Sequence, residues 1–175
     1  MKKLAVLVLL LVFLLSGCRG TSTPDATLYN NFLADLKAQQ SDLYYYTKDI
    51  DGNGVADLII LENTKLSVYT YEKSVMLIGE QDFFTGTVRF FSSDNPDYSG
   101  VFYFTVGGGA EHYGYMTVED KKLSFEDLWE ENYATEPQDS ENRIKELSPD
   151  KDLISESKRL YDNNADIKFV SLNKG

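Results

Sequence analysis

The sequence predicts an α+β fold, in which an antiparallel meander sheet of about six to seven strands carries an N-terminal and a C-terminal helix. Three observations predict it. Apolar residues recur with helical spacing near each end of the chain. Between these ends lie short segments rich in aromatic and β-branched residues. Turn-forming residues separate these segments at short intervals, which is typical of strands joined by hairpins.

Both predicted helices have an amphipathic pattern. The N-terminal one runs to about Gln39, and its apolar stripe is Leu28, Phe32, Leu33 and Leu36. The C-terminal one begins with Ser148 as cap, Pro149 at the first helical position and Asp150 in the first turn. Its stripe is Leu153, Ile154, Leu160 and Tyr161.

The predicted strands lie between the helices, with one short edge strand after them. Residues 125–133 are expected to form one or two helical turns, and residues 134–146 a mobile loop. The strand segments are 44–47, 58–61, 66–71, 75–78, 87–91, 100–106, 113–118, 122–125 and 167–172.

The N-terminus has the pattern of an export signal. Two lysines precede an apolar run of twelve residues, Leu4 to Leu15, which is shorter than the roughly 20 needed to span a bilayer. The run ends in Leu15-Ser16-Gly17-Cys18, which resembles the lipobox of bacterial lipoproteins. The resemblance implies cleavage after a signal peptide of residues 1–17 and lipidation of Cys18 with acyl chains such as palmitate. Residues 18–25 would then be a tether, and 26–175 a single globular domain held at the extracytoplasmic side of the cell membrane.

Composition excludes several kinds of function. Cys18 is the only cysteine, so a lipidated chain has no thiol nucleophile, disulfide framework or cysteine zinc site. Without Lys2 and Lys3, 15 basic residues face 28 acidic ones, a net charge of −13. Such acidity argues against nucleic acid and against anionic head groups as partners.

One stretch, residues 49–57, carries a cation-binding pattern. Oxygen-bearing side chains occupy loop positions 1, 3, 5 and 9, and a glycine at position 6 permits a sharp turn. The expected ligands of a Ca²⁺ ion are the side chains of Asp49, Asp51, Asn53 and Asp57 and the backbone carbonyl of Val55. A plain hairpin turn is the alternative, because Asp, Asn and Gly also favour turns for backbone reasons.

This loop differs from an EF-hand, whose position 12 is a bidentate Glu, because Ile60 stands there and strand-forming residues flank the loop. Its D-x-D-G-N-G-x-x-D-L pattern resembles the calcium loops of FG-GAP and integrin-propeller repeats. The resemblance implies that the Asp at position 9 closes the site. The general layout also resembles uncharacterised secreted lipoproteins of Gram-positive bacteria. With no bidentate Glu, we expect a dissociation constant of roughly 10⁻⁴ M.

Other polar groups give weaker indications. His112, the only histidine, stands in a glycine-rich segment, either as an exposed hairpin residue or as a base oriented by Glu111. The acidic residues of 126–131 are either a solvated face or a second weak cation site. Several tyrosines either pack in the core or form an exposed row that binds sugars or a protein: Tyr44, Tyr46, Tyr69, Tyr71, Tyr103, Tyr113 and Tyr115.

These patterns favour a membrane-anchored binding or interaction module with a structural calcium, and not an enzyme. Its expected partners are the membrane, through the lipid, and an extracellular protein or glycan. A carboxylate-based hydrolase of the cell envelope or of extracellular polymers is one alternative, since such chemistry needs only two acids. A purely structural envelope lipoprotein is the other.

Overall fold

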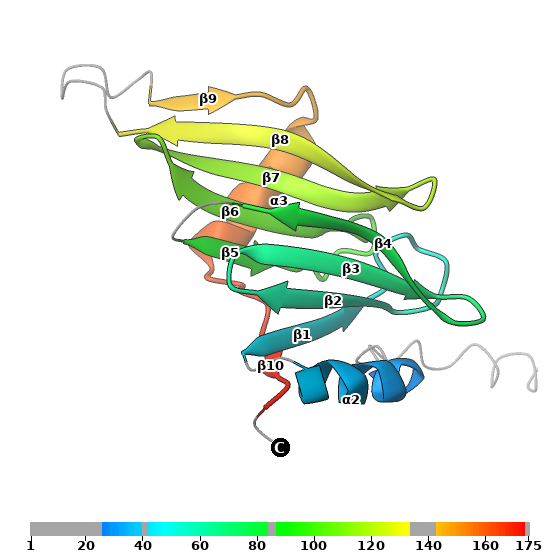
Figure 1. The fold of residues 1–175 in the computed structure, drawn as a ribbon. Helices are drawn as coiled ribbons and strands as arrows, with labels where there is room; N and C mark the ends of the chain where they lie inside the picture. The colour runs from blue at the N-terminus through cyan, green and yellow to red at the C-terminus, as the bar shows by residue number, and fades with distance from the viewer. Residues whose placement is uncertain (1–25, 40–41, 84–86, 134–142, 174–175) are drawn as a thin grey trace, which may run out of the picture.

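The structure is a computed structural model that describes residues 26–39, 42–83, 87–133 and 143–173. In these ranges the α+β class is confirmed, with most of the ordered backbone in strands (Figure 1). The helical elements are the 3₁₀ turn η1 (Ala26–Tyr29), α2 (Asn30–Gln39) and α3 (Lys151–Asp162). The strands are β1 (Leu43–Lys48), β2 (Asp57–Glu62), β3 (Lys65–Tyr71), β4 (Val75–Asp82), β5 (Val88–Phe91), β6 (Val101–Gly107), β7 (Ala110–Glu119), β8 (Lys122–Asn132), β9 (Ile144–Glu146) and β10 (Val170–Ser171).

The strands form two sheets, which corrects the prediction of a single meander. Sheet A has the order β10-β1-β2-β3-β4 and sheet B the order β5-β6-β7-β8-β9, and all pairs are antiparallel. Each sheet is a meander, and β10 returns from the end of the chain to pair with β1. The run at 58–60 is buried on consecutive residues, so both faces of sheet A are covered, which one sheet with a helix on one face does not provide.

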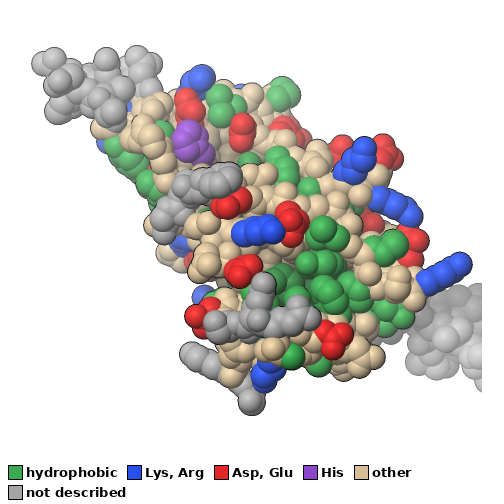
Figure 2. Space-filling view, in the orientation of Figure 1, with side chains coloured by type: hydrophobic (Ala, Val, Ile, Leu, Met, Phe, Trp, Pro, Cys, Tyr) green, Lys and Arg blue, Asp and Glu red, His purple; other side chains and the backbone are tan. Residues whose placement is uncertain are grey.

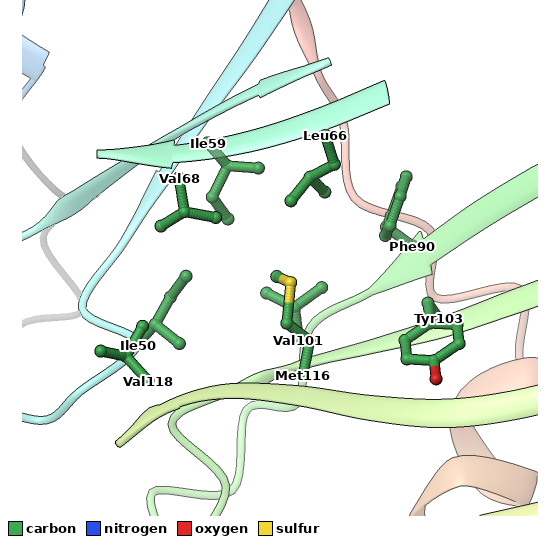
Figure 3. Close-up of a cluster of buried hydrophobic side chains, with 9 residues drawn as sticks. All are labelled: Ile50, Ile59, Leu66, Val68, Phe90, Val101, Tyr103, Met116 and Val118. Atoms are coloured by element: carbon green, nitrogen blue, oxygen red, sulfur yellow. The ribbon is translucent and has the colours of Figure 1, made fainter. Parts of the chain in front are cut away.

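The central core lies between the two sheets. Ile59, Leu66 and Val68 project from β2 and β3 toward the side chains of sheet B (Figure 3). The opposite layer supplies Phe90, Val101, Tyr103, Met116 and Val118. Ile50, from the connection between β1 and β2, lies in the same cluster and is fully buried.

A helix covers the outer face of each sheet. Tyr29 and Leu33, from η1 and α2, pack on sheet A against Leu43, Leu58 and Ile60. On sheet B, α3 contributes Leu153, Ile154 and Leu160 to a cluster with Phe91, Phe102, Phe104, Tyr113, Leu128 and Trp129. The order of layers is therefore helix, sheet A, sheet B, helix (Figure 1).

Residues 125–132 form part of strand β8, so the prediction of helical turns there is wrong. A register shift between Tyr113 and Gly114 on β7 places a bulge in the pairing, and Leu128 and Trp129 are both buried as a result. Phe125, Leu128 and Trp129 therefore stand at positions i, i+3 and i+4, which is also the spacing of the apolar face of a helix. The pairing is reinforced by the Trp129 ring, which stacks on Tyr113 with centroids 3.4 Å apart.

The helix cap and the strands near the C-terminus also differ from the prediction. The cap of α3 is Asp150, whose carboxylate accepts hydrogen bonds from the N–H groups of Asp152 and Leu153. Ser148, the predicted cap, instead donates to Glu126 and accepts from the Asp150 N–H. Strand β9 lies within residues expected to be a loop, and the final strand is limited to β10.

The signal peptide, Cys18 and the tether lie outside the described residues, as does most of the expected mobile loop. No helix in the described ranges has the length and hydrophobicity needed to cross a bilayer.

Gly100 is a position where the fold excludes a side chain. A Cβ there would lie 2.4 Å from the Met116 carbonyl oxygen and 2.5 Å from the Tyr115 ring. We expect Gly100→Ala to lower the free energy of unfolding by about 1–3 kcal/mol, because backbone cannot move aside. Gly79→Ala is the control, since its Cβ would meet only the Leu123 side chain, at 3.1 Å. Chemical denaturation measures both, and equal effects would contradict this packing.

Candidate metal centre

The candidate site is the hairpin connection between β1 and β2, residues 49–56, together with Asp57 at the start of β2. Gly52 and Gly54 adopt φ values of 71° and 87°, in the left-handed region that favours glycine. These two glycines fold the segment so that the carboxylates at its beginning approach Asp57. One oxygen from each of Asp49, Asp51 and Asp57 lies within 4.8 Å of the others. Among the described residues this acidic group could hold a metal ion.

Asp57 is the least solvent-exposed of the three carboxylates. Its side chain is 0 % exposed, and its Oδ2 accepts a hydrogen bond of 3.0 Å from the Ile50 N–H. Its Oδ1 is buried and has no hydrogen-bond partner in the described part of the chain. A buried carboxylate oxygen without a partner is costly, and a bound cation would satisfy it.

Burial raises the pKa of Asp57 to about 6. The Ile50 N–H and the Thr70 side chain oppose this shift, whereas the charges of Asp51 and Asp49 add to it. The site therefore concentrates negative charge that the Ile50 N–H and the Thr70 side chain offset only in part. This is the electrostatic environment that a divalent cation relieves.

Asp49 and Asp51 are bound into the loop by its own backbone. The Asn53 N–H donates to Asp49 Oδ1 at 3.0 Å and to Asp51 Oδ1 at 3.1 Å, and the Gly54 N–H donates to Asp49 Oδ2 at 2.8 Å. These contacts hold both carboxylates on the inner side of the turn. They also order the loop, because its backbone N–H groups bind its own carboxylates.

The two remaining predicted ligands lie in the same turn. The Asn53 amide donates to Asp51 Oδ2 at 2.8 Å, and its oxygen accepts from the Val55 N–H at 2.7 Å. Asn53 is exposed and Val55 half-buried. Of the five predicted ligands, the structure thus groups the three carboxylates, and the roles of Asn53 and Val55 as ligands stay predictions.

Helix and sheet contacts fix the loop in ways that the sequence did not reveal. The buried Tyr29 hydroxyl donates to the Ala56 carbonyl at 2.7 Å, and the pKa of Tyr29 is raised by burial and by the charges of Asp57 and Asp51. The Ser99 hydroxyl donates to the Ile50 carbonyl at 2.8 Å. These partners stand 27 and 49 residues away in the chain, and no local motif marks them.

Lys48 joins the same loop to the segment before β6. Its ammonium donates to Ser92 Oγ at 2.9 Å and lies 3.4 Å from the Tyr98 carbonyl oxygen. Burial lowers the pKa of Lys48 to about 8, and the adjacent Asp49 opposes that shift. The Lys48 ammonium group therefore contacts the chain between β5 and β6 of sheet B and does not pair closely with the three carboxylates.

The pair of His112 and Glu111 is not brought together as a site. Glu111 accepts a hydrogen bond of 2.5 Å from the Tyr113 hydroxyl, whereas His112 Nδ1 lies 3.8 Å from Glu130 Oε2. The His112 side chain is 44 % exposed. This arrangement fits a surface residue of the β7–β8 pair more closely than an oriented base.

The acidic residues of 126–131 do not gather into one cation site either. Their partners differ: Glu126 bonds with Ser148, Asp127 accepts from the Tyr103 hydroxyl at 3.3 Å, and Glu131 pairs with Arg143 at 3.3 Å. Glu130 pairs with Lys145 at 3.4 Å. Strand alternation and the bulge on β8 send these side chains in different directions.

The tyrosines do not form one exposed row. Tyr103 and Tyr113 are buried in the cores, and Tyr44 is exposed. The other predicted members are half-buried: Tyr46, Tyr69, Tyr71 and Tyr115. Core packing therefore accounts for most of them.

Comparison with models of protein families, with curated proteins and with solved structures found no match to this chain.

The buried acid predicts a specific pH dependence of the metal-free protein. A pKa raised from 3.8 to about 6 means that the folded state holds its proton more tightly than the unfolded state. Stability from this group is therefore present below pH 4 and is lost as the pH rises through 6. In the absence of divalent ions, wild type should lose about 2–3 kcal/mol of unfolding free energy between pH 4 and 7 relative to Asp57→Asn.

Urea unfolding at several pH values in the presence of a chelator measures this difference. Using the variant as reference removes the contributions of other carboxylates, which titrate in both proteins. Parallel pH profiles for the two proteins would show that Asp57 is not held in a charge-unfavourable environment.

Proposed function

We propose that this chain is a lipid-anchored extracytoplasmic protein in which the 49–57 loop binds a structural Ca²⁺ ion, and that the domain serves as a binding or interaction module. The observation that carries the calcium proposal is the fully buried Asp57 carboxylate. One of its oxygens has no hydrogen-bond partner among the described residues, and Asp49 and Asp51 lie beside it.

The chemistry of the donor set favours calcium. All proposed ligands are oxygens, which are the ligands of hard cations, and Ca²⁺ accepts six to eight of them in flexible geometry. Asp49, Asp51, Asn53 and Asp57, with the Val55 carbonyl, supply five, and water completes the shell. Mg²⁺ requires near-ideal octahedral geometry and gives up its water reluctantly, which suits a turn of mixed amide and carboxylate ligands less well.

The position of the loop supports a structural role for the ion. The loop residue Ile50 is fully buried in the core between the sheets, and its N–H bonds to Asp57. The same loop is bonded to Tyr29 before α2 and to Ser99 before β6. An ion that neutralises Asp57 therefore stabilises the junction of the N-terminal helix with both sheets.

The anchored location is supported by the lipobox pattern, Leu15 to Cys18, behind an apolar run too short to span a bilayer. An extracytoplasmic site also suits a calcium loop of modest affinity, because extracellular modules bind Ca²⁺ with dissociation constants of about 10⁻⁴ to 10⁻³ M. In this proposal the domain has no catalytic task, and its partners are an extracellular protein or glycan.

Calcium should stabilise the folded protein by mass action. With a dissociation constant of about 10⁻⁴ M, 10 mM Ca²⁺ should raise the free energy of unfolding by about 2.7 kcal/mol. Asp51→Ala should remove most of this gain, whereas Glu119→Gln, an exposed acid outside the loop, should keep it. Denaturant unfolding of the chain that follows Cys18, with and without calcium, measures the effect.

Two outcomes would contradict the proposal. One is an unfolding curve that calcium does not shift. The other is an equal loss of the calcium effect in both variants, which would indicate general screening of an acidic surface.

A further inference from the structure

An apolar surface remains on the outer face of sheet A next to the N-terminal helix. Hydrophobic side chains gather there over β3 and β4 (Figure 2). The side chains of Leu77 and Leu28 are 52 % and 44 % exposed. We name this surface the helix-side patch. Its exposed members are Leu28 and Leu77, and its half-buried members, which also pack on the core under α2, are Phe32, Tyr69, Tyr71 and Val75.

The helix-side patch is continuous from the helix to the edge strand. The Phe32 ring lies 4.7 Å from the Tyr69 ring, and Leu28, in the 3₁₀ turn η1, precedes Phe32 by four residues in the chain. Tyr69 faces Leu77 directly across the β3–β4 pair. Residues opposite each other in an antiparallel pair share one face of the sheet, so Leu77 extends the patch to β4.

Helix α2 covers only part of this face. It lies toward the β1 edge of sheet A, away from β4 (Figure 1). Tyr71 and its cross-strand partner Val75 are half-buried against the cluster of Tyr29, Leu33 and Leu58 under α2, and Leu77 beyond them is more than half exposed. Leu28 and Leu77 are therefore the side chains through which this surface reaches solvent.

The covalent chain indicates what covers the patch. Only seven residues, 19–25, separate Cys18 from Ala26, so the start of η1 lies within about 30 Å of the lipidated residue even if these residues are fully extended. Leu28 is the third residue of the domain. The short linker would therefore keep Leu28 close to the bilayer and give the domain a high effective concentration there.

We infer that the helix-side patch docks on the surface of the bilayer that holds the lipid anchor, with Leu28 and Leu77 in the interfacial region. This inference rests on the anchor in the proposed function. Docking is apolar and not electrostatic, because the mature charge of −13 disfavours anionic head groups. It places the outer face of sheet A toward the membrane, and β9, an edge strand of sheet B, lies at the opposite end of the molecule from α2 (Figure 1).

The test uses the lipidated protein, reconstituted into phosphatidylcholine vesicles that contain doxyl-labelled lipid as a quencher. Acylation blocks the thiol of Cys18, the only cysteine, so Leu77→Cys supplies one site for a nitrobenzoxadiazole label. Ile144→Cys is the matched control, because Ile144 is 50 % exposed but lies on β9. We expect several-fold stronger lipid quenching of the label at position 77 than of the label at position 144.

A second substitution tests the patch itself. Leu28→Glu in the Leu77→Cys background should reduce the quenching at position 77 while the protein still floats with the vesicles. Equal quenching at positions 77 and 144 would overturn the docking. A label at position 77 that responds to protein concentration instead of lipid would also overturn it, and would point to a second copy of the chain.

The proposed anchor has its own readout. If the protein does not float with the vesicles, both the anchor and the docking that depends on it are contradicted. If it floats but the two labels are quenched equally, the docking alone fails.

Discussion

One buried carboxylate, that of Asp57 at the start of β2, constrains the region where the layers of the domain meet. Asp57 is fully buried. Its Oδ2 accepts a hydrogen bond from the Ile50 N–H, and its Oδ1 has no hydrogen-bond partner among the described residues. Replacing Asp57 by an apolar residue would avoid this cost, yet the hairpin carries two further carboxylates within reach of it. This arrangement is the basis of the proposal that a bound cation is the counter-ion of Asp57.

This charge lies where the layers of the domain meet. Ile50 extends from the loop into the core between the sheets, and Tyr29 connects the loop to the helix that covers sheet A. Lys48 and Ser99 connect it to the chain between β5 and β6. An ion at Asp57 would therefore act on a junction of several elements, and the N-terminal helix among them is the one that follows the proposed lipid anchor.

Local patterns in the sequence predicted the loop, both long helices and most strands, because turn residues and apolar periodicity act over a few positions. The division into two sheets was not predictable, since alternation on a strand such as β2 does not say what covers either face. Strand β8 was misread because its bulge buries Leu128 and Trp129 in succession. The hydrogen bond from the Tyr29 hydroxyl to the Ala56 carbonyl joins residues 27 positions apart, so only the folded chain reveals it.

The central claim is that a calcium ion takes up the charge of Asp57, and calorimetric titration with Ca²⁺ at pH 7 and pH 5 tests it most directly. Because the pKa of Asp57 is about 6 without metal, the ion must displace a proton at the lower pH. One saturable site at pH 7, with affinity about tenfold weaker at pH 5, is the expected result. Absence of binding at pH 7, or unchanged binding in Asp57→Asn, would contradict the claim.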